Sequence, residues 1–141
     1  MALDNIFGIA GTALNAQLTR MNATASNLAN AGTMAGTEKD AFRAKRAVFK
    51  ALVDEQQTHA GAPYVGGVKI SHIADDASPP VKVADPKNPL ADKDGYVVQS
   101  NVNEVSEIVE MMAAARSYQN NVETVNTAKH LMSRTLDLLR S

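Results

Sequence analysis

Hydrophobic side chains near the N-terminus recur every seven residues. One row of this repeat consists of Phe7, Leu14, Met21 and Leu28. Leu18 and Ala25 follow four residues after Leu14 and Met21, which completes the a/d spacing of a heptad repeat. This period predicts a helix over about residues 4–30. Asn30 and Gly32 are plausible residues at its end, because both tolerate the left-handed backbone conformation that terminates many helices.

The C-terminal part of the chain carries a longer version of the same repeat. One row consists of Met111, Tyr118, Val125, Met132 and Leu139, and the other of Ile108, Ala115, Val122, Lys129 and Leu136. Only Lys129 breaks the apolar pattern. Asn101 can act as an N-cap, with Glu104 as its partner in a box-like pair. The repeat and this cap predict a second helix over about residues 102–139.

The segment between the two predicted helices has a different composition. It contains all five prolines and most of the glycines. Short runs typical of β-strands occur at residues 68–70, 81–83 and 95–98, and the stretch 42–53 is ambiguous between strand and helix. The chain is therefore predicted to be mainly α with a small β-rich insertion, its long terminal helices paired as an antiparallel coiled coil. The corresponding division is a coiled-coil assembly domain of residues 1–33 plus 101–141, and an insertion domain of residues 34–100.

Both predicted helices have unusually few charges outside their apolar rows. From residue 5 to residue 37 the only charged side chain is Arg20, and between Met111 and Val122 it is Arg116. A solvent-exposed helix usually carries charges on its polar face. Small neutral polar groups can be buried in a protein contact without the desolvation cost of a charge. The alternative is an ordinary surface helix rich in alanine and asparagine. We expect the outer faces of these helices to contact neighbouring subunits.

Composition excludes several classes of function. The net charge is −1 and cysteine is absent, so no global field favours nucleic acid and no thiolate chemistry is available. No run of about 18 apolar residues could span a membrane, and the N-terminus lacks the basic region of a secretory signal. The basic cluster of residues 43–50 is too small for a nucleic-acid footprint, and a solvated face is the simpler interpretation. No catalytic constellation and no cofactor motif is present, so we expect no enzyme activity and no cofactor.

The stretch ADPKNPLADKDGYVVQSNVNEV, residues 84–105, looks superficially like a calcium loop. With Gly95 at the sixth position of such a loop, Leu90 takes the first position and Asn101 the twelfth. A calcium loop needs carboxylates at both of those positions, so only a weak calcium site stays open. The alternative is a structural corner. In that interpretation Asp94-Gly95 forms a tight turn and the next residues form a strand.

In three blocks of sequence, SNLANAGT, FRAKRAVF and NPLADKDGYV, the chain resembles the flagellar basal-body rod proteins, most closely the short proximal rod type. The first block is SNLANAGT, residues 26–33, which resembles the signature A-N-x-x-T of axial proteins. The second is FRAKRAVF, residues 42–49. The third runs from NPLADKDGYV, residues 88–97, through NVN, residues 101–103, into the long helix. The residues that carry the resemblance are Asn27, Asn30, Thr33, Asn88, Pro89, Leu90, Gly95, Tyr96, Asn101, Val102, Arg116 and Tyr118.

Two positions depart from the pattern of this family. Phe42 stands where such proteins usually have tyrosine, and Ser100 stands where a proline usually precedes Asn101-Val102. Proline restricts its own backbone and that of the residue before it. We therefore expect the start of the long helix to be less rigid here.

The resemblance implies a structural role in the rod of the bacterial flagellum. Such proteins stack helically with copies of themselves and with other rod proteins, between the rotor (the MS-ring) and the hook, and transmit motor torque. They leave the cytoplasm through the flagellar type III export apparatus without a cleaved signal peptide, and the rod lies in the periplasm. Two alternatives stay open: another axial protein of the rod–hook junction, or a periplasmic module that binds a ligand at residues 84–98.

The assembly interface predicted from the two repeats combines their apolar members. It consists of Phe7, Leu14, Leu18, Met21, Leu28, Ile108, Met111, Ala115, Tyr118, Val122, Val125, Met132, Leu136 and Leu139.

Overall fold

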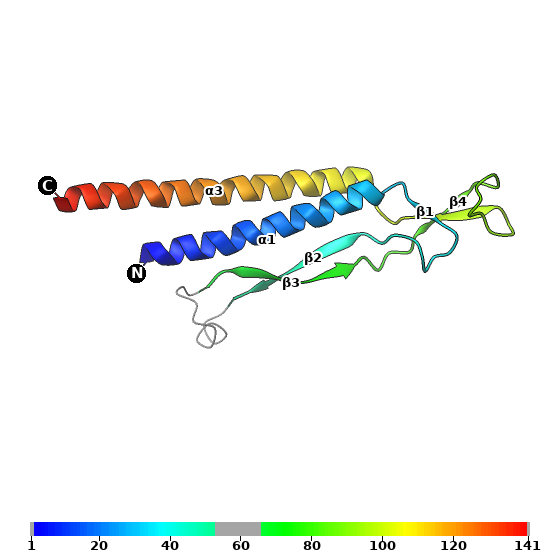
Figure 1. The fold of residues 1–141 in the computed structure, drawn as a ribbon, viewed down its shortest axis with the longest axis horizontal. Helices are drawn as coiled ribbons and strands as arrows, with labels where there is room; N and C mark the ends of the chain where they lie inside the picture. Colours follow the sequence, from blue (N-terminus) through cyan, green and yellow to red (C-terminus); the bar gives the residue numbers. More distant parts are fainter. Residues whose placement is uncertain (1, 53–65, 141) are drawn as a thin grey trace.

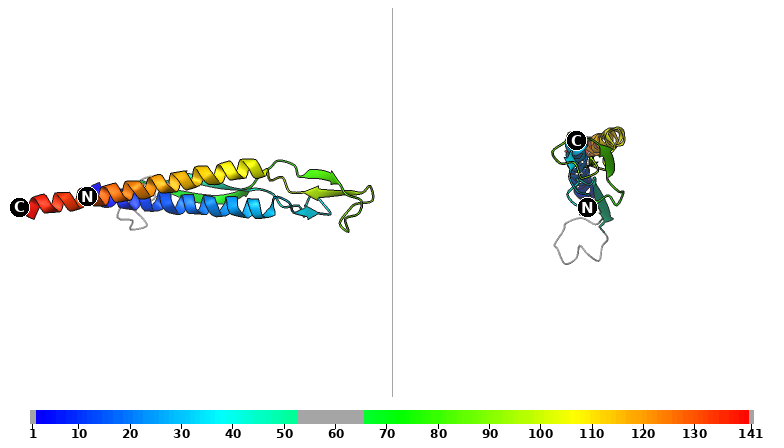
Figure 2. Two further views of the ribbon diagram at one scale, coloured as in Figure 1. Left: turned by 90° about the horizontal axis from the view of Figure 1, so that it is seen from above. Right: turned by 90° about the vertical axis from the view of Figure 1, so that its right-hand side faces the viewer.

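Two long helices form the body of an elongated molecule (Figure 1). The computed structural model describes residues 2–52 and 66–140. Helix α1 spans Ala2–Asn30 and helix α3 spans Glu104–Arg140. They lie side by side and run in opposite directions, and the C-terminal end of α3 extends beyond the start of α1 (Figure 2). Both predicted helices are confirmed, and so is the prediction of a mainly α chain with a small β-rich insertion.

The strands form two small antiparallel sheets. Strand β2 (Lys45–Ala51) pairs with β3 (Val68–Asp75), and this hairpin packs along α1. Strands β1 (Met34–Ala35), β5 (Tyr96–Gln99) and β4 (Val81–Ala84) form a second sheet in the order β1-β5-β4. The three predicted strands are confirmed. The ambiguous stretch contains a strand because β3 supplies its hydrogen-bonding partner.

The core of the molecule consists largely of alanine. Its buried apolar residues are Ala10, Ala16, Ala23, Ala31, Ala41, Ala44, Val97, Val98, Ala114 and Ala128. The largest side chains that are fully buried are Glu107, Val97 and Asn27, and two of these three are polar. Small side chains let the backbones approach closely, but each of them buries little apolar area. Polar contacts therefore have an unusually large share in holding the elements together.

The end of α1 and the start of α3 meet where the chain passes between the two sheets. The Asn103 side chain, and not that of Asn101, caps α3: its Oδ1 accepts a hydrogen bond from the Ser106 N–H at 3.0 Å. The N-cap prediction for Asn101 is wrong because Asn103 directly precedes the helix. Helix α1 ends at Asn30 without a left-handed residue. Instead, the Asn30 carbonyl accepts hydrogen bonds from both the backbone N–H and the hydroxyl of Thr33.

Ser100 joins the end of α1 to the strand that precedes α3. Its hydroxyl donates to the Ala31 carbonyl at 2.6 Å, and its N–H donates to the Thr33 carbonyl at 3.1 Å. A proline could make neither of these hydrogen bonds. The side chain is also buried. The start of the long helix is thus held by hydrogen bonds at the position where the family usually has a rigid ring.

The stretch that looked like a calcium loop is a corner in the chain. The Asp92 carboxylate accepts hydrogen bonds from the N–H groups of Asp94 and Tyr96, each at 2.9 Å. Gly95 has a φ of 80°, and β5 begins at the next residue. The turn-and-strand interpretation is therefore confirmed. Within residues 2–52 and 66–140, no three His, Cys, Asp or Glu side chains form a group that could hold a metal ion.

Replacing Gly95 with alanine is expected to destabilise the protein by about 1 kcal/mol or more. Its φ lies in the region that favours glycine, and an added Cβ would lie 3.1 Å from the Pro86 Cβ. Gly32 is the matched control, because an added Cβ there meets nothing within 4 Å. Urea unfolding of G95A and G32A measures the difference. Equal stability of the two variants would contradict the strain at the corner.

Candidate functional site

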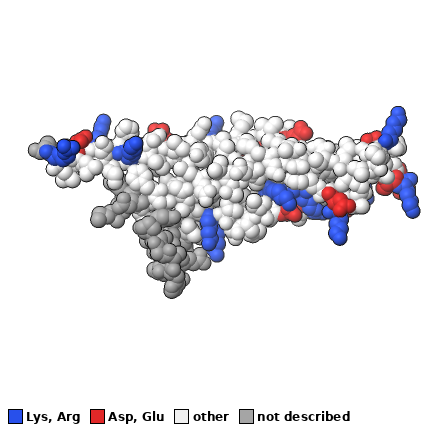
Figure 3. Space-filling view, viewed as in Figure 1, with Lys and Arg blue, Asp and Glu red and all other residues white. Residues whose placement is uncertain are grey.

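The outer surface of the helix pair carries few charges and several exposed apolar side chains. Charged residues gather toward the ends of the molecule and on the hairpin side, and much of the helical body has none (Figure 3). Near the start of α3, four exposed apolar residues follow the spacing i, i+3, i+4, i+7: Val105, Ile108, Val109 and Met112, which are 50–72% exposed. Leu18 of α1 is 48% exposed. This sparsely charged surface is the candidate assembly surface.

The predicted interface residues fall into two groups. The half-buried ones are Phe7, Leu14, Met21, Leu28, Met111, Ala115, Tyr118, Val122, Val125 and Met132, whereas Leu18, Ile108, Leu136 and Leu139 are exposed. The exposed group cannot pack between the two helices of one chain, so any interface role for it depends on neighbours. The role of both groups in assembly stays a prediction.

The fully buried residues of α3 also recur every seven residues, but they are not the residues of the predicted apolar rows. They are Glu107, Ala114 and Ala128, and Asn121 at the remaining position of this row is half-buried. Opposite them, Arg20 and Asn27 of α1 contact α3 through Glu110 and Glu107. The seam is therefore centred on small and polar side chains, with the bulky rows at its flanks. The spacing of Glu107, Ala114, Asn121 and Ala128 is the sequence signal for this seam.

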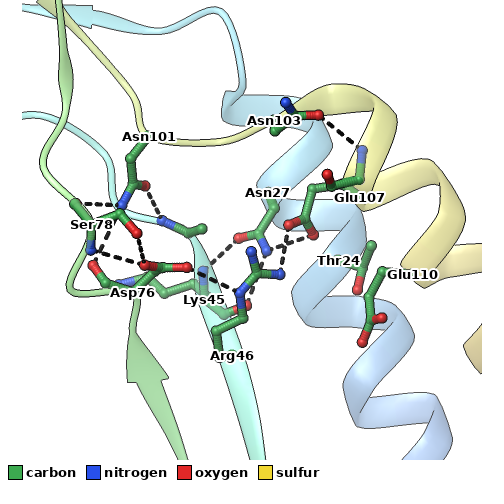
Figure 4. Close-up of polar contacts among 12 residues, drawn as sticks. Thr24, Asn27, Lys45, Arg46, Asp76, Ser78, Asn101, Asn103, Glu107 and Glu110 are labelled. Atoms are coloured by element: carbon green, nitrogen blue, oxygen red, sulfur yellow. Dashed lines mark hydrogen bonds and ion pairs between the residues drawn. The ribbon is translucent and has the colours of Figure 1, made fainter.

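A polar junction joins both helices to the β2–β3 hairpin; we define it by Asn27, Arg46 and Glu107 (Figure 4). The Glu107 side chain is 0% exposed. One carboxylate oxygen accepts a hydrogen bond from Asn27 Nδ2 at 2.9 Å, and the other accepts one from Arg46 Nη1 at 2.6 Å. A buried carboxylate is tolerated when a cation and hydrogen-bond donors surround it. Here the donors come from α1 and β2.

Asn27 connects α1 to the backbone of β2. Its Oδ1 accepts a hydrogen bond from the Lys45 N–H at 2.7 Å, and its Nδ2 donates to the Lys45 carbonyl at 2.9 Å. The amide thus pairs with the edge of β2 much as a neighbouring strand would. With Glu107, this side chain has partners in two other elements. An apolar residue of the same size could satisfy none of these groups.

The network continues from Arg46 to the segment after β3. Arg46 Nε lies 3.4 Å from Asp76 Oδ2, and Asp76 accepts hydrogen bonds from the hydroxyl and the N–H of Ser78. Asn101 completes this side: its Oδ1 accepts from the Ala44 N–H, and its Nδ2 donates to the Ser78 carbonyl, each at 2.8 Å. The function of Asn101 is therefore to join three segments of the chain.

Hydrogen bonds and charge shift the pKa values of both members of the Arg46–Asp76 pair. The hydrogen bonds from Ser78 are the main cause that lowers the pKa of Asp76, and Arg46 adds to it against the opposing effect of burial. For Arg46, burial opposes the charged form, but the hydrogen bond and charge of Glu107, with those of Asp76, outweigh it and raise the pKa. Both shifts favour the charged forms that the network needs.

Acidification below the ordinary pKa of an aspartate is expected to destabilise the protein through Asp76. Because its pKa is lowered in the folded state, its contribution is present above the unfolded pKa and is lost as the pH falls through the folded pKa. Urea unfolding over this acidic range should show a shallower pH dependence for D76N and S78A than for the unaltered chain. The same pH dependence in all three proteins would contradict the assignment.

The basic cluster of residues 43–50 serves the fold. Arg46 is bound in the junction, Lys45 pairs with Asp75, and Arg43 donates to the Asp76 carbonyl at 3.4 Å. Its two central cations therefore face carboxylates of the same chain, and their charges are largely neutralised there.

The remaining motif residues lie at turns and on α3. Asn30 and Thr33 form the end of α1, and Asn88 donates to Asp85 and accepts from the Leu90 N–H. Pro89, Leu90 and Tyr96 are exposed near the corner, Val102 is half-buried before α3, and Arg116 and Tyr118 lie on α3. Sequence reasoning missed Arg46, Asp76, Asn103 and Glu107.

Comparisons with known proteins agree with this architecture. Residues 7–34 match the family described as "Flagella basal body rod protein", and residues 93–138 match "Flagellar basal body rod FlgEFG protein C-terminal". The chain is 48% identical to "Flagellar basal-body rod protein FlgC" of Salmonella typhimurium and of Escherichia coli O157:H7, and 46% identical to that of Yersinia enterocolitica. Each comparison covers 98% of both proteins.

A two-helix chain with a sparsely charged outer surface and these matches is a flagellar axial protein of the structural kind. The chain belongs to the FlgC family of flagellar basal-body rod proteins. The resemblance found in the sequence is confirmed. This is a family of structural proteins and not of enzymes. In the part of the chain that the structure describes, neither helix is long and apolar enough to cross a membrane.

Proposed function

We propose that this chain is a structural subunit of the proximal rod of the bacterial flagellar basal body. The observation that carries the proposal is the partly apolar outer surface of α1 and the N-terminal half of α3, which carries few charges, in a chain of the FlgC family. Exposed side chains such as Val105, Val109 and Met112 are stabilised only when a neighbour covers them. The role of this surface is to contact other rod subunits.

The shape of the subunit supports the same function. The chain exposes 9533 Å², whereas a compact protein of 15.0 kDa is expected to expose about 7,000 Å². The excess comes from an elongated body with a thin alanine core. Such a body gains stability when copies pack along it. We therefore propose that part of the apolar area of this chain is buried only in the assembly.

Helical stacking follows from the arrangement of the surfaces. A contact between different patches of identical subunits is heterologous and propagates until it forms a helix or a ring. In our proposal the helix pair packs in the rod as an antiparallel coiled coil, in an assembly domain of residues 1–33 and 101–141. Residues 34–100 form the insertion that fixes the offset between neighbours. Motor torque is then transmitted through many packed helix faces.

The partners of the subunit follow from its place in the rod. We propose contacts with copies of itself and with other rod proteins, within the hook–basal-body complex that begins at the MS-ring. The chain reaches the periplasmic region through the flagellar type III export apparatus, without a cleaved signal peptide. The nearly neutral chain with no cysteine is compatible with this route.

Complementation tests the proposed function. A strain that lacks its FlgC protein should regain motility when it expresses this chain with an affinity tag in an exposed loop. The tagged chain should then be isolated together with intact basal bodies, with an N-terminal mass that includes every encoded residue after the initiator methionine. A motile strain whose basal bodies lack the tag would contradict the proposal. An unrelated tagged export substrate is the control for non-specific retention.

A further inference from the structure

In the junction of Asn27, Arg46 and Glu107, the two charged side chains differ strongly in their exposure to solvent, and stabilisation alone does not explain this difference. Glu107 is 0% exposed between the two helices, whereas the Arg46 side chain is 43% exposed. If the β2–β3 hairpin left α1, Arg46 could return to water without a large change elsewhere. Glu107 would then have lost its cation, and its negative charge would be left beside Asn27 with no ion-pair partner. A buried charge that has lost its cation is strongly destabilising.

The contact between the hairpin and α1 depends on polar groups at its two ends. At one end is the junction, with the hydrogen bonds from Asn27 to the Lys45 backbone. At the other end, the Val68 N–H donates to the Thr12 hydroxyl at 3.1 Å. Between them, grooves of about 340 and 450 Å³ open where the hairpin meets α1. Apolar packing between the hairpin and α1 is therefore incomplete along these grooves, and the polar contacts at the two ends help to hold the hairpin in place.

We propose that Glu107 is a positioning residue that makes closure of the helix pair conditional on docking of the β2–β3 hairpin. Helices α1 and α3 can bury Glu107 only when β2 brings Arg46 against it. The three elements consequently open and close as one unit. This inference concerns the folding of the subunit itself, and it holds whether or not the subunit builds a rod.

Two further observations agree with this coupling. The centre of the helix seam consists of alanines and polar side chains, which supply little apolar area of their own, so the pair is sensitive to one buried charge. The Arg20–Glu110 pair also joins α1 to α3, but both side chains are partly exposed and both belong to the helices. That pair can therefore form without the hairpin. Among the ion pairs within residues 2–52 and 66–140, only Arg46–Glu107 links a helix to β2.

Hydrogen exchange of the purified full-length chain, followed by mass spectrometry, tests the proposal. In the unaltered chain, the slowest amides of α1, α3 and β2 should exchange at a common rate. In R46M, the helix amides should exchange about a hundredfold faster or more, because Glu107 has lost its cation. K45M is the matched control: Lys45 is the adjacent cation of the same strand and pairs with Asp75 at the surface, so its loss should change the rate little.

The double variant R46M with E107L distinguishes coupling between the hairpin and the helices from a simple contribution of the ion pair to the stability of the fold. Without the buried charge, the helix amides should recover the slow exchange of the unaltered chain, while the β2 and β3 amides exchange faster and independently. If R46M does not fold, recovery of protected helices in the double variant still supports the proposal. The proposal fails if R46M behaves like K45M, if the double variant remains open, or if its hairpin and helices still exchange at one rate. Unprotected helices in the unaltered chain would also overturn it.

Discussion

Replacing Leu18 with aspartate is expected to leave the subunit folded and to abolish its incorporation into the rod. Leu18 is 48% exposed in a segment with no charged residue other than Arg20 between residues 5 and 37. A carboxylate there stays hydrated in the free subunit, so the folded chain loses little. In an assembled contact it would have to be desolvated without a cation, which costs several kcal/mol per subunit and recurs in every copy.

Circular dichroism and urea unfolding of L18D should therefore match those of the unaltered chain, while a complemented strain swims no better than the deletion strain. L18M is the control, because it keeps an apolar side chain of similar volume. V122D is expected to reduce both folding and incorporation, since Val122 is half-buried on α3. Normal motility of the L18D strain would show that this face of α1 meets no neighbour.

Replacing Asn27 with leucine is expected to lower the free energy of unfolding by about 3 kcal/mol or more. The change removes the two hydrogen bonds to the Lys45 backbone and the one to the Glu107 carboxylate. Leucine has the same branched shape and the same number of heavy atoms, so the loss comes from polar groups left unsatisfied in a buried place rather than from a cavity.

Urea unfolding measures this change, and N22L is the control on the same helix, because Asn22 is exposed. The expected result is a large fall in the midpoint for N27L and a small change for N22L. Similar midpoints for the two variants would mean that the junction contributes little to the fold. Asn27 lies in the block SNLANAGT, residues 26–33, just before the A-N-x-x-T signature, so the same experiment gives this part of the block a physical reason.

The helices, the strands and the corner could be predicted because their signals are local. The heptad repeats placed the helices to within a few residues of Ala2–Asn30 and Glu104–Arg140. The mismatch with a calcium loop favours a structural corner, and the Asp94-Gly95 turn then predicts where β5 begins. These features depend on residues next to one another in the sequence.

The junction could not be predicted because its partners are far apart in the sequence and of an unexpected type. A glutamate in the first turn of a helix usually stays in water, where it complements the helix dipole. Glu107 is instead buried against Arg46, a residue 61 positions earlier. The sequence predicts a seam of bulky side chains, because a heptad repeat is recognised by its large apolar residues. In the structure, alanines lie at the centre of the seam and let the two backbones approach each other. Asn101 and Asn103 can both cap a helix, and only the backbone path selects Asn103.

The measurement that tests the central claim most directly is a cryo-EM map of basal bodies isolated from the complemented strain. The account predicts density for this chain in the proximal rod, with the outer faces of α1 and α3, including Leu18 and Val109, against neighbouring subunits. A map in which the chain is absent from the rod would contradict it. So would a rod in which these faces point into solvent and the subunits meet through other surfaces.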